Sequence, residues 1–143
     1  MIADIKTKDV MKKELIVLHP KDSIQEAEQI FNRYHIHHIP VVVDNKLVGI
    51  ISLGDMLISN KFLNIHRDKF PANDQVFFNT VDQIMTPKPY RVNEEDSITK
   101  VLELMQTKRI NCIPVVNAEG LTGIVTSFDI INFLNQNIET PCD

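Results

Sequence analysis

The chain has 143 residues, 43% of them hydrophobic, which is the composition of a globular protein with one sizeable core or two small ones. Its formal net charge is −4 and its 15 basic residues are scattered among 19 acidic ones, which argues against a nucleic-acid partner. No uncharged apolar run approaches the roughly 20 residues that span a bilayer, and the charged start of the sequence is unlike a secretory signal peptide.

The cysteines agree with a reducing compartment. Cys112 lies beside an apolar run and Cys142 in a polar tail, and their spacing is typical of neither a zinc site nor a disulfide framework. We therefore expect a soluble, cytoplasmic protein with no nucleic-acid or membrane partner.

The first half of the chain predicts one small α/β unit. Residues 14–20 (ELIVLHP) favour a leading strand, and Ser23 with Glu26 forms the pattern of a capping box at a helix start. Two β-branched runs around the turn residues 44–46 predict a hairpin, and a second helix is expected to start near Asp55. The first helix has its apolar residues at helical spacing: Ile24, Ala27, Ile30, Phe31 and Tyr34.

Residues 61–80 combine turn residues with large apolar side chains. Exposing all of these side chains would create a large apolar patch, so we expect the segment to pack on the units or to line a dimer interface. The apolar side chains are Phe62, Leu63, Phe70, Phe77 and Phe78.

The second half repeats the first at a constant offset of 74 residues. IPVV begins at Ile39 and again at Ile113, and the same offset aligns Met11 with Met85. The second copy predicts a leading strand over 89–95, a helix capped by Asp96 or Ser97, a hairpin around 118–120 and a second helix near Asp129.

Such self-similarity indicates two copies of a small domain, because the period exceeds the roughly 20 to 50 residues of solenoid repeats. We expect an α/β (α+β) fold of two β-α-β-β-α repeats packed as a pseudo-two-fold pair. The predicted boundaries are 7–60 for repeat 1, 61–78 for the aromatic-containing linker and 79–137 for repeat 2.

Each repeat carries a helix after a capping serine, then h-P-V-V, a hairpin, and G-h-h-S/T-x-x-D, written as GIISLGD and GIVTSFD. This tandem order resembles a pair of cystathionine-β-synthase (CBS) domains over almost the whole chain, from about Thr7 to Asn137. The resemblance implies a stand-alone regulatory module that binds an adenosine-containing ligand in clefts between the repeats. The implied ligands are AMP, ADP, ATP or S-adenosylmethionine, and the implied partners are a second copy in a homodimer and an unidentified protein target.

By this resemblance, Ser52 and Asp55 form one half-site, and Thr126 and Asp129 form the other. An aspartate beside a helix start can accept two hydrogen bonds from a ribose diol, while the hydroxyl and the helix N–H groups face a phosphate. Further contacts are implied for the strand starts, the leading segments and one cation: His38, Ile39, Cys112, Ile113, Val17, His19, Val92, Asn93 and Arg109.

A second interpretation stays open, because S-x-x-D at a helix start is also a capping box that binds nothing. The residue before the aspartate, often basic in family members that hold phosphates, is Gly54 in one copy and Phe128 in the other. Lys108 and Arg109 also suit exposed cations at a helix end. We expect the two sites to differ.

The histidines of YHIHHIP raise a metal-binding alternative, because imidazole is a common zinc, copper or nickel ligand. In an extended strand, His35 and His37 would project to one side and His38 to the other, so at most two would converge. No cysteine or carboxylate lies at a recognised spacing, so we expect no metal site and interpret these residues as polar cleft or solvated side chains, with a protonatable phosphate contact as an intermediate case.

Enzyme chemistry finds little support. The sequence has no nucleophile elbow, no phosphate loop of the G-x-x-x-x-G-K type and no HExxH motif, so we expect no catalytic residue and no cofactor beyond the ligand. The hypotheses are therefore a nucleotide-sensing module, an unliganded structural dimerisation module that uses the aromatic linker, and, last, a metal sensor.

Overall fold

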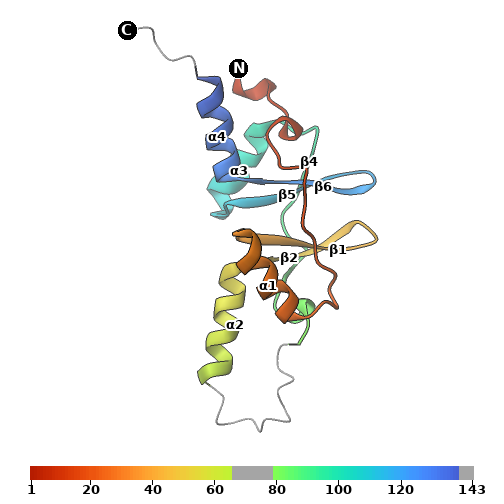
Figure 1. The fold of residues 1–143 in the computed structure, drawn as a ribbon. Coiled ribbons are helices and arrows are strands. Elements are labelled where there is room, and N and C mark those ends of the chain that lie inside the picture. Colours follow the sequence, from red (N-terminus) through yellow and green to blue (C-terminus); the bar gives the residue numbers. More distant parts are fainter. Residues whose placement is uncertain (66–78, 139–143) are drawn as a thin grey trace. The chain divides into compact units, whose positions relative to one another are not determined.

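The computed structural model describes residues 1–65 and 79–138, with only the backbone described for 60–65. The packing predicted for the aromatic segment from Phe62 to Phe78 lies outside the described side chains. In chain order (Figure 1) the helices, the short 3-10 helices (η) and the strands are η1 (Ile2–Asp4), η2 (Thr7–Asp9), α1 (Ile24–Tyr34), β1 (His38–Val43), β2 (Lys46–Ser52), α2 (Leu53–Ile65), η5 (Val81–Gln83), β3 (Thr86–Pro87), β4 (Val92–Asn93), α3 (Ile98–Lys108), β5 (Cys112–Asn117), β6 (Gly120–Thr126) and α4 (Ser127–Asn137).

These elements form two compact units that do not follow the chain in simple order. The first unit is Ile16–Pro89, and the second unit joins Met1–Leu15 to residues 90–138. The N-terminal segment therefore packs with the second repeat, and residues 79–89 pack with the first. Within the described residues, no helix is both long and apolar enough to cross a membrane.

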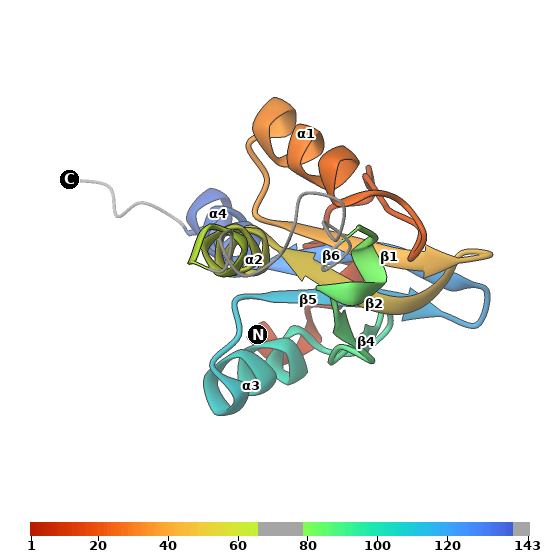
Figure 2. The ribbon, with the colours of Figure 1, turned by 90° about the horizontal axis from the view of Figure 1, so that it is seen from below.

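The first unit contains a three-stranded sheet in the order β1-β2-β3, with antiparallel neighbours. Asp44 and Asn45 join β1 to β2, and both have positive φ angles, 48° and 64°, as a two-residue hairpin turn requires. Figure 2 shows α1 on one side of this hairpin and α2 leaving the end of β2. The sequence analysis did not predict β3, because two residues are too few to produce a strand pattern.

The second unit repeats this plan with the sheet order β4-β5-β6. β4 runs parallel to β5, with Val92 opposite Val115, and β5 and β6 form the antiparallel hairpin. In the first unit the counterpart of β4 is a single parallel bridge between Leu18 and Val41. The leading strand predicted over 89–95 is therefore reduced to the two residues of β4, and the one predicted over 14–20 is wrong, because only a single bridge forms there.

The first helix of each repeat has the serine cap that the sequence predicted. Ser23 Oγ accepts a hydrogen bond from the Glu26 N–H at 3.1 Å, and Ser97 Oγ accepts one from the Thr99 N–H at 3.3 Å. Of the two candidates for the second repeat, Ser97 is thus the cap of α3. The Asp96 carboxylate is used in the preceding turn instead.

The cores of the two units are built from equivalent residues. In each hairpin the innermost residues are aliphatic and fully buried, and the first helix covers them with apolar side chains, which include Ala27 and Phe31 in the first unit. The innermost side chains are Ile39, Val41 and Ile51 in the first unit and Ile113, Val115 and Val125 in the second.

Two glycines leave the space in which two methionine side chains pack. A Cβ at Gly49 would overlap Met85 Sδ, and a Cβ at Gly123 would overlap Met11 Sδ and lie 2.9 Å from the Lys12 carbonyl oxygen. Met11 precedes Gly123 in the sequence, whereas Met85 follows Gly49. The two contacts nevertheless have equivalent geometry in the two units. The segments that carry Met11 and Met85 are thus anchored in the same way, each by a methionine packed on the glycine of a hairpin strand.

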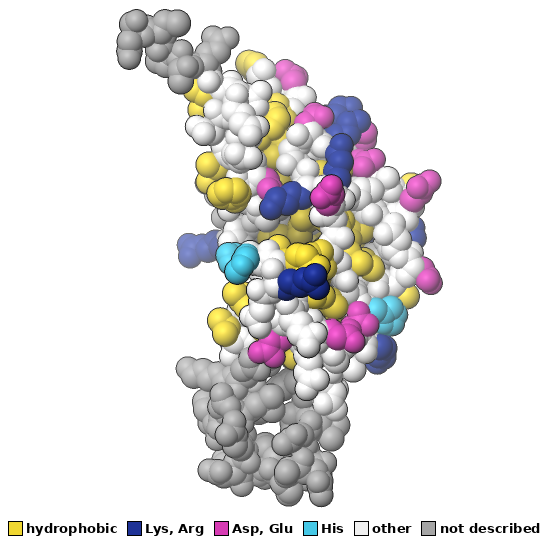
Figure 3. Space-filling view, in the orientation of Figure 1, with side chains coloured by type: hydrophobic (Ala, Val, Ile, Leu, Met, Phe, Trp, Pro, Cys, Tyr) yellow, Lys and Arg dark blue, Asp and Glu magenta, His cyan; other side chains and the backbone are white. Residues whose placement is uncertain are grey.

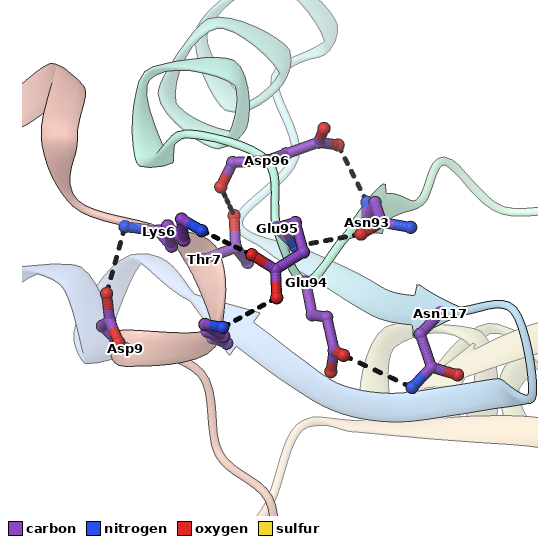
Figure 4. Close-up of polar contacts among 9 residues, drawn as sticks. Lys6, Thr7, Asp9, Asn93, Glu94, Glu95, Asp96 and Asn117 are labelled. Carbon is purple, nitrogen blue, oxygen red and sulfur yellow. Dashed lines mark hydrogen bonds and ion pairs between the residues drawn. The ribbon is translucent and has the colours of Figure 1, made fainter.

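Polar bonds also anchor the N-terminal segment on the second repeat (Figure 4). The Thr7 N–H and hydroxyl both donate to the Asp96 carbonyl oxygen, at 2.8 and 2.9 Å. Lys6 Nζ and Lys8 Nζ lie 2.6 and 2.7 Å from the two carboxylate oxygens of Glu95. These hydrogen bonds and charges lower the pKa of Glu95 to about 2. On the face drawn in Figure 3, basic and acidic side chains are interspersed within each unit.

Candidate functional site: two helix starts with a capping aspartate

The first predicted half-site lies where β2 passes into α2. The Ser52 N–H donates to Asp55 Oδ2 at 2.9 Å, and the Asp55 N–H donates to Ser52 Oγ at 3.0 Å. Both side chains therefore cap the helix, and α2 begins at Leu53, two residues before the start expected near Asp55. Within the described residues, neither an ion pair nor a hydrogen bond engages the other carboxylate oxygen, Oδ1.

The second half-site has the same geometry where β6 passes into α4. The Thr126 N–H and hydroxyl donate to Asp129 Oδ2, each at 2.9 Å, and the Asp129 N–H donates to Thr126 Oγ1 at 3.2 Å. The Asp129 side chain is only 7% exposed. Capping is thus a real role of these residues, and it occupies one of the two carboxylate oxygens, leaving acceptor capacity at the other.

The helix N–H groups are less available than the sequence suggested. The Leu53 N–H donates to the His37 carbonyl oxygen at 2.9 Å, and the Ser127 N–H donates to the Asn111 carbonyl oxygen at 3.0 Å. Together with the caps, these bonds occupy the first and third N–H groups of each helix. An anionic ligand group at either helix start would therefore depend more on side-chain cations than on the backbone.

The strand starts are brought beside the two caps by the hairpin register. His38 pairs with Ser52 across the first hairpin, and Cys112 pairs with Thr126 across the second. The next residues, Ile39 and Ile113, are fully buried, so only their backbone groups remain for an interaction.

The two strand-start side chains differ in chemistry. Burial, together with the charge of His37, lowers the pKa of His38 below its usual value, although Asp55 acts in the opposite direction. Burial and the neighbouring Asp129 charge raise the pKa of Cys112 to about 12, against a smaller opposing effect of Lys12. Both groups are therefore neutral at pH 7.

The leading segments form matching turns. The His19 N–H donates to Asp22 Oδ2 and the Asn93 N–H to Asp96 Oδ2, each at 2.8 Å. His19 Nδ1 accepts from the Lys21 N–H just as Asn93 Oδ1 accepts from the Glu95 N–H, at 3.1 and 2.9 Å. The side chains of His19 and Asn93 thus have local structural roles. Of the neighbouring predicted contacts, Val17 is exposed and Val92 is buried.

The predicted cation Arg109 ends α3 in the left-handed conformation, with a φ angle of 54°. Its exposed side chain makes no ion pair or hydrogen bond within the part of the chain that the structure describes. The preceding Lys108 ammonium lies 5.5 Å from the centre of the Tyr90 ring. Among the described residues, neither cation forms a hydrogen bond or an ion pair with Thr126 or Asp129.

The histidine cluster differs from the extended geometry assumed in the sequence analysis. His35 ends α1 in the left-handed conformation, with a φ angle of 52°, and β1 begins only at His38. The alternation that was used to orient all three side chains is therefore wrong for His35. Among the described residues, no three His, Cys, Asp or Glu side chains lie close enough to hold a metal ion.

Sequence reasoning missed Lys12. Its ammonium lies 3.6 Å from Asp129 Oδ1, the oxygen that the cap does not use. The sequence feature that points to this residue is the repeat offset, because it aligns Met11 with Met85 and therefore places Lys12 opposite Thr86. That alignment did not reveal that Lys12 pairs with the second repeat.

Comparison with known proteins assigns the family. The family model of the CBS domain matches residues 7–59 and 81–136. The chain is 30% identical over 119 residues to inosine-5'-monophosphate dehydrogenase of Korarchaeum cryptofilum, which covers 82% of this chain and 22% of that enzyme. It is 32% identical over 127 residues to the uncharacterized protein YlbB of Bacillus subtilis, covering 87% of this chain and 79% of YlbB. The chain spans only 22% to 24% of the length of four curated relatives, all of them enzymes.

Solved structures give the same result. The crystal structure of CBSX2 in complex with AMP is 27% identical, with a TM-score of 0.76 over 92% of this chain and 96% of that one. The CBS domain pair of MJ0100 in complex with 5'-methylthioadenosine and S-adenosyl-L-methionine is 29% identical, with a TM-score of 0.75 over 94% and 98%. The predicted mixed α/β fold of two repeats is thereby confirmed, and the chain belongs to the CBS domain family.

Proposed function

We propose that this chain is a regulatory module that binds an adenosine-containing compound, such as AMP, ADP, ATP or S-adenosylmethionine. The observation that supports this most directly is the pair of capping aspartates, each with one carboxylate oxygen outside the cap. Two CBS pairs of similar fold were solved with AMP or with 5'-methylthioadenosine and S-adenosyl-L-methionine. Regulation requires that the ligand bind two arrangements of the protein with different affinity.

In this proposal Asp55 and Asp129 each accept hydrogen bonds from a ribose diol while their other oxygen keeps the helix capped. A carboxylate has about four acceptor positions, so the two roles are compatible. The backbone groups of His38 and Ile39, or of Cys112 and Ile113, would read the edge of the adenine. The neutral His38 and Cys112 side chains suit contact with an uncharged base.

We also propose that the module self-associates through the second helix of each repeat. Four apolar side chains on α2 and α4 are each more than 60% exposed, and exposed apolar side chains that gather into a patch are typical of an interaction surface. They are Leu57, Ile58, Phe128 and Ile131. The protein target that would receive the signal is unidentified.

Ligand binding is tested by thermal unfolding of the chelator-treated protein with AMP, ADP, ATP and S-adenosylmethionine. A compound at about one hundred times its dissociation constant stabilises the folded state by roughly 2.7 kcal/mol, which moves the melting temperature by several degrees. Asp55→Asn and Asp129→Asn keep one acceptor for the helix cap but lose the charge. They should weaken binding at their own half-site by about 10- to 100-fold.

Ser23→Ala is the matched control, because it removes a helix cap from α1 and should cost about 1 kcal/mol of stability without altering ligand affinity. If no compound raises the melting temperature, or if binding is unchanged in both aspartate variants, the proposal is wrong.

The alternative of an unliganded dimerisation module has its own support, because the caps account for Ser52, Asp55, Thr126 and Asp129 without any ligand. A flat thermal response from a folded, dimeric protein would favour that alternative.

A further inference from the structure

The second half-site contains a cation that the first lacks. Lys12 Nζ lies 3.6 Å from Asp129 Oδ1, whereas Asp55 has no ion-pair partner within the described residues. The residue in the position equivalent to Lys12 is Thr86, which pairs with Ile50 on β2 as Lys12 pairs with Ile124 on β6. Two half-sites with the same backbone thus carry different charge.

The backbone of Lys12 is held firmly beside the site. Its N–H donates to the Ile124 carbonyl oxygen at 2.8 Å, and the Ile124 N–H donates back to the Lys12 carbonyl oxygen at 3.1 Å. Ile124 is two residues before Thr126, so the bridge fixes the origin of the lysine side chain next to the cap.

The side chain of Lys12 is largely exposed to solvent. It is 59% exposed, while the Asp129 side chain that it faces is 7% exposed. The lysine ammonium is a compact charge on a flexible stem, so it can leave one carboxylate oxygen for another anion nearby without moving the backbone. Asp129 raises the pKa of the Cys112 thiol and Lys12 lowers it, which is consistent with all three side chains sharing one local environment.

We infer that Lys12 determines ligand specificity at the second half-site, which it adapts to adenosine compounds that carry a phosphate, whereas the first half-site suits uncharged or cationic ones. The inference rests on the proposed function and names the ligand class of each half-site. In the empty protein Lys12 neutralises Asp129. When a ribose diol occupies Asp129 Oδ1, the ammonium turns to the phosphate.

Charge supports this division. A phosphate monoester carries between about −1.5 and −2 charges at neutral pH, so it is repelled by an unpaired carboxylate and attracted by a lysine. The Asp129–Lys12 pair has no net charge, whereas Asp55, beside a neutral His38, leaves the first half-site negative. The first and third N–H groups of the helix at each site are already bonded, so a phosphate there depends more on a side-chain cation.

The test compares AMP with adenosine by isothermal titration calorimetry at low and high salt. Lys12→Thr introduces the residue of the other repeat. It should weaken AMP binding by about tenfold, because the binding free energy of a partly exposed hydrogen bond to a charged group is at the lower end of the usual range. Adenosine binding should stay unchanged or become tighter. Lys12→Arg keeps the charge and should keep the preference for AMP. Thr86→Lys should raise the AMP affinity of the first half-site.

Lys13→Thr is the matched control, because it makes the same change of net charge at the next residue, which is exposed and forms no ion pair or hydrogen bond within the part of the chain that the structure describes. If Lys12→Thr fails to fold, Lys12→Gln takes its place in the comparison. An unchanged ratio of AMP to adenosine affinity in the Lys12 variant overturns the role of Lys12 but leaves the proposed function intact. If the wild-type protein binds neither compound, the proposed function and this inference both fail.

Discussion

Replacing Gly123 by alanine should destabilise the second unit more than the same change at Gly49 destabilises the first. At Gly49 the three atoms nearest to the added methyl group all belong to the side chain of Met85, including its Cε and Cγ atoms at 3.1 Å, and a methionine side chain can shift. At Gly123 it also meets the backbone carbonyl oxygen of Lys12 at 2.9 Å. That oxygen accepts one of the two hydrogen bonds that attach the N-terminal segment to β6.

The magnitudes follow from these contacts. Overpacking a core costs typically 1–3 kcal/mol, and each backbone hydrogen bond that is strained adds up to about 1 kcal/mol. We therefore expect a loss of roughly 3 kcal/mol in the free energy of unfolding for Gly123→Ala and roughly 1 kcal/mol for Gly49→Ala. Adding Met11→Ala to Gly123→Ala should recover only part of the loss, because the carbonyl contact remains.

The assay is urea unfolding followed by far-ultraviolet circular dichroism, since the chain has no tryptophan. Gly54→Ala is the control: its added methyl group has only an ordinary contact, 3.5 Å from Ser52 Oγ, and lies in an exposed first helical turn. It should stabilise the protein by about 0.5–1 kcal/mol through helix propensity. The close packing of Met11 on Gly123 is wrong if the free energy of unfolding of Gly123→Ala lies within about 0.5 kcal/mol of the wild-type value. It is also wrong if Gly123→Ala loses no more stability than Gly49→Ala.

Two further predictions concern charge and self-association. The folded-state pKa of Glu95 is about 2, below its ordinary value of 4.5, so its ion pairs with Lys6 and Lys8 stabilise the protein above pH 4.5 and this contribution is lost as the pH falls from about 4.5 to about 2. The difference in melting temperature between wild type and Glu95→Gln should therefore shrink over that range, and a constant difference would contradict the ion pairs. Ile131→Glu should turn the proposed dimer into a monomer in sedimentation velocity. Gln136→Glu adds the same charge on another face of α4 and should leave the dimer intact. Equal behaviour of the two variants would exclude the face of α4 that carries Ile131 from the interface.

The elements that the sequence predicted correctly are those specified by neighbouring residues. A serine cap bonds to an N–H two or three residues on, a two-residue turn joins adjacent strands, and S/T-x-x-D closes a bond across three positions. These interactions leave local patterns that can be recognised in a single sequence, and the 74-residue offset made each pattern appear twice. The caps Ser23 and Ser97, both hairpins and the α/β repeat were predictable for this reason.

Tertiary structure alone decided which repeat each flanking segment joins. Met11 and Lys12 fall within the predicted first repeat, yet they pack on Gly123, Ile124 and Asp129, more than one hundred positions away. No local pattern encodes such a partner, because the two repeats offer nearly identical strands and glycine seats, and the choice depends on long-range contacts such as those of Lys6 and Lys8 with Glu95. The motif thus specified two similar aspartates, and the fold decided which of them faces a lysine.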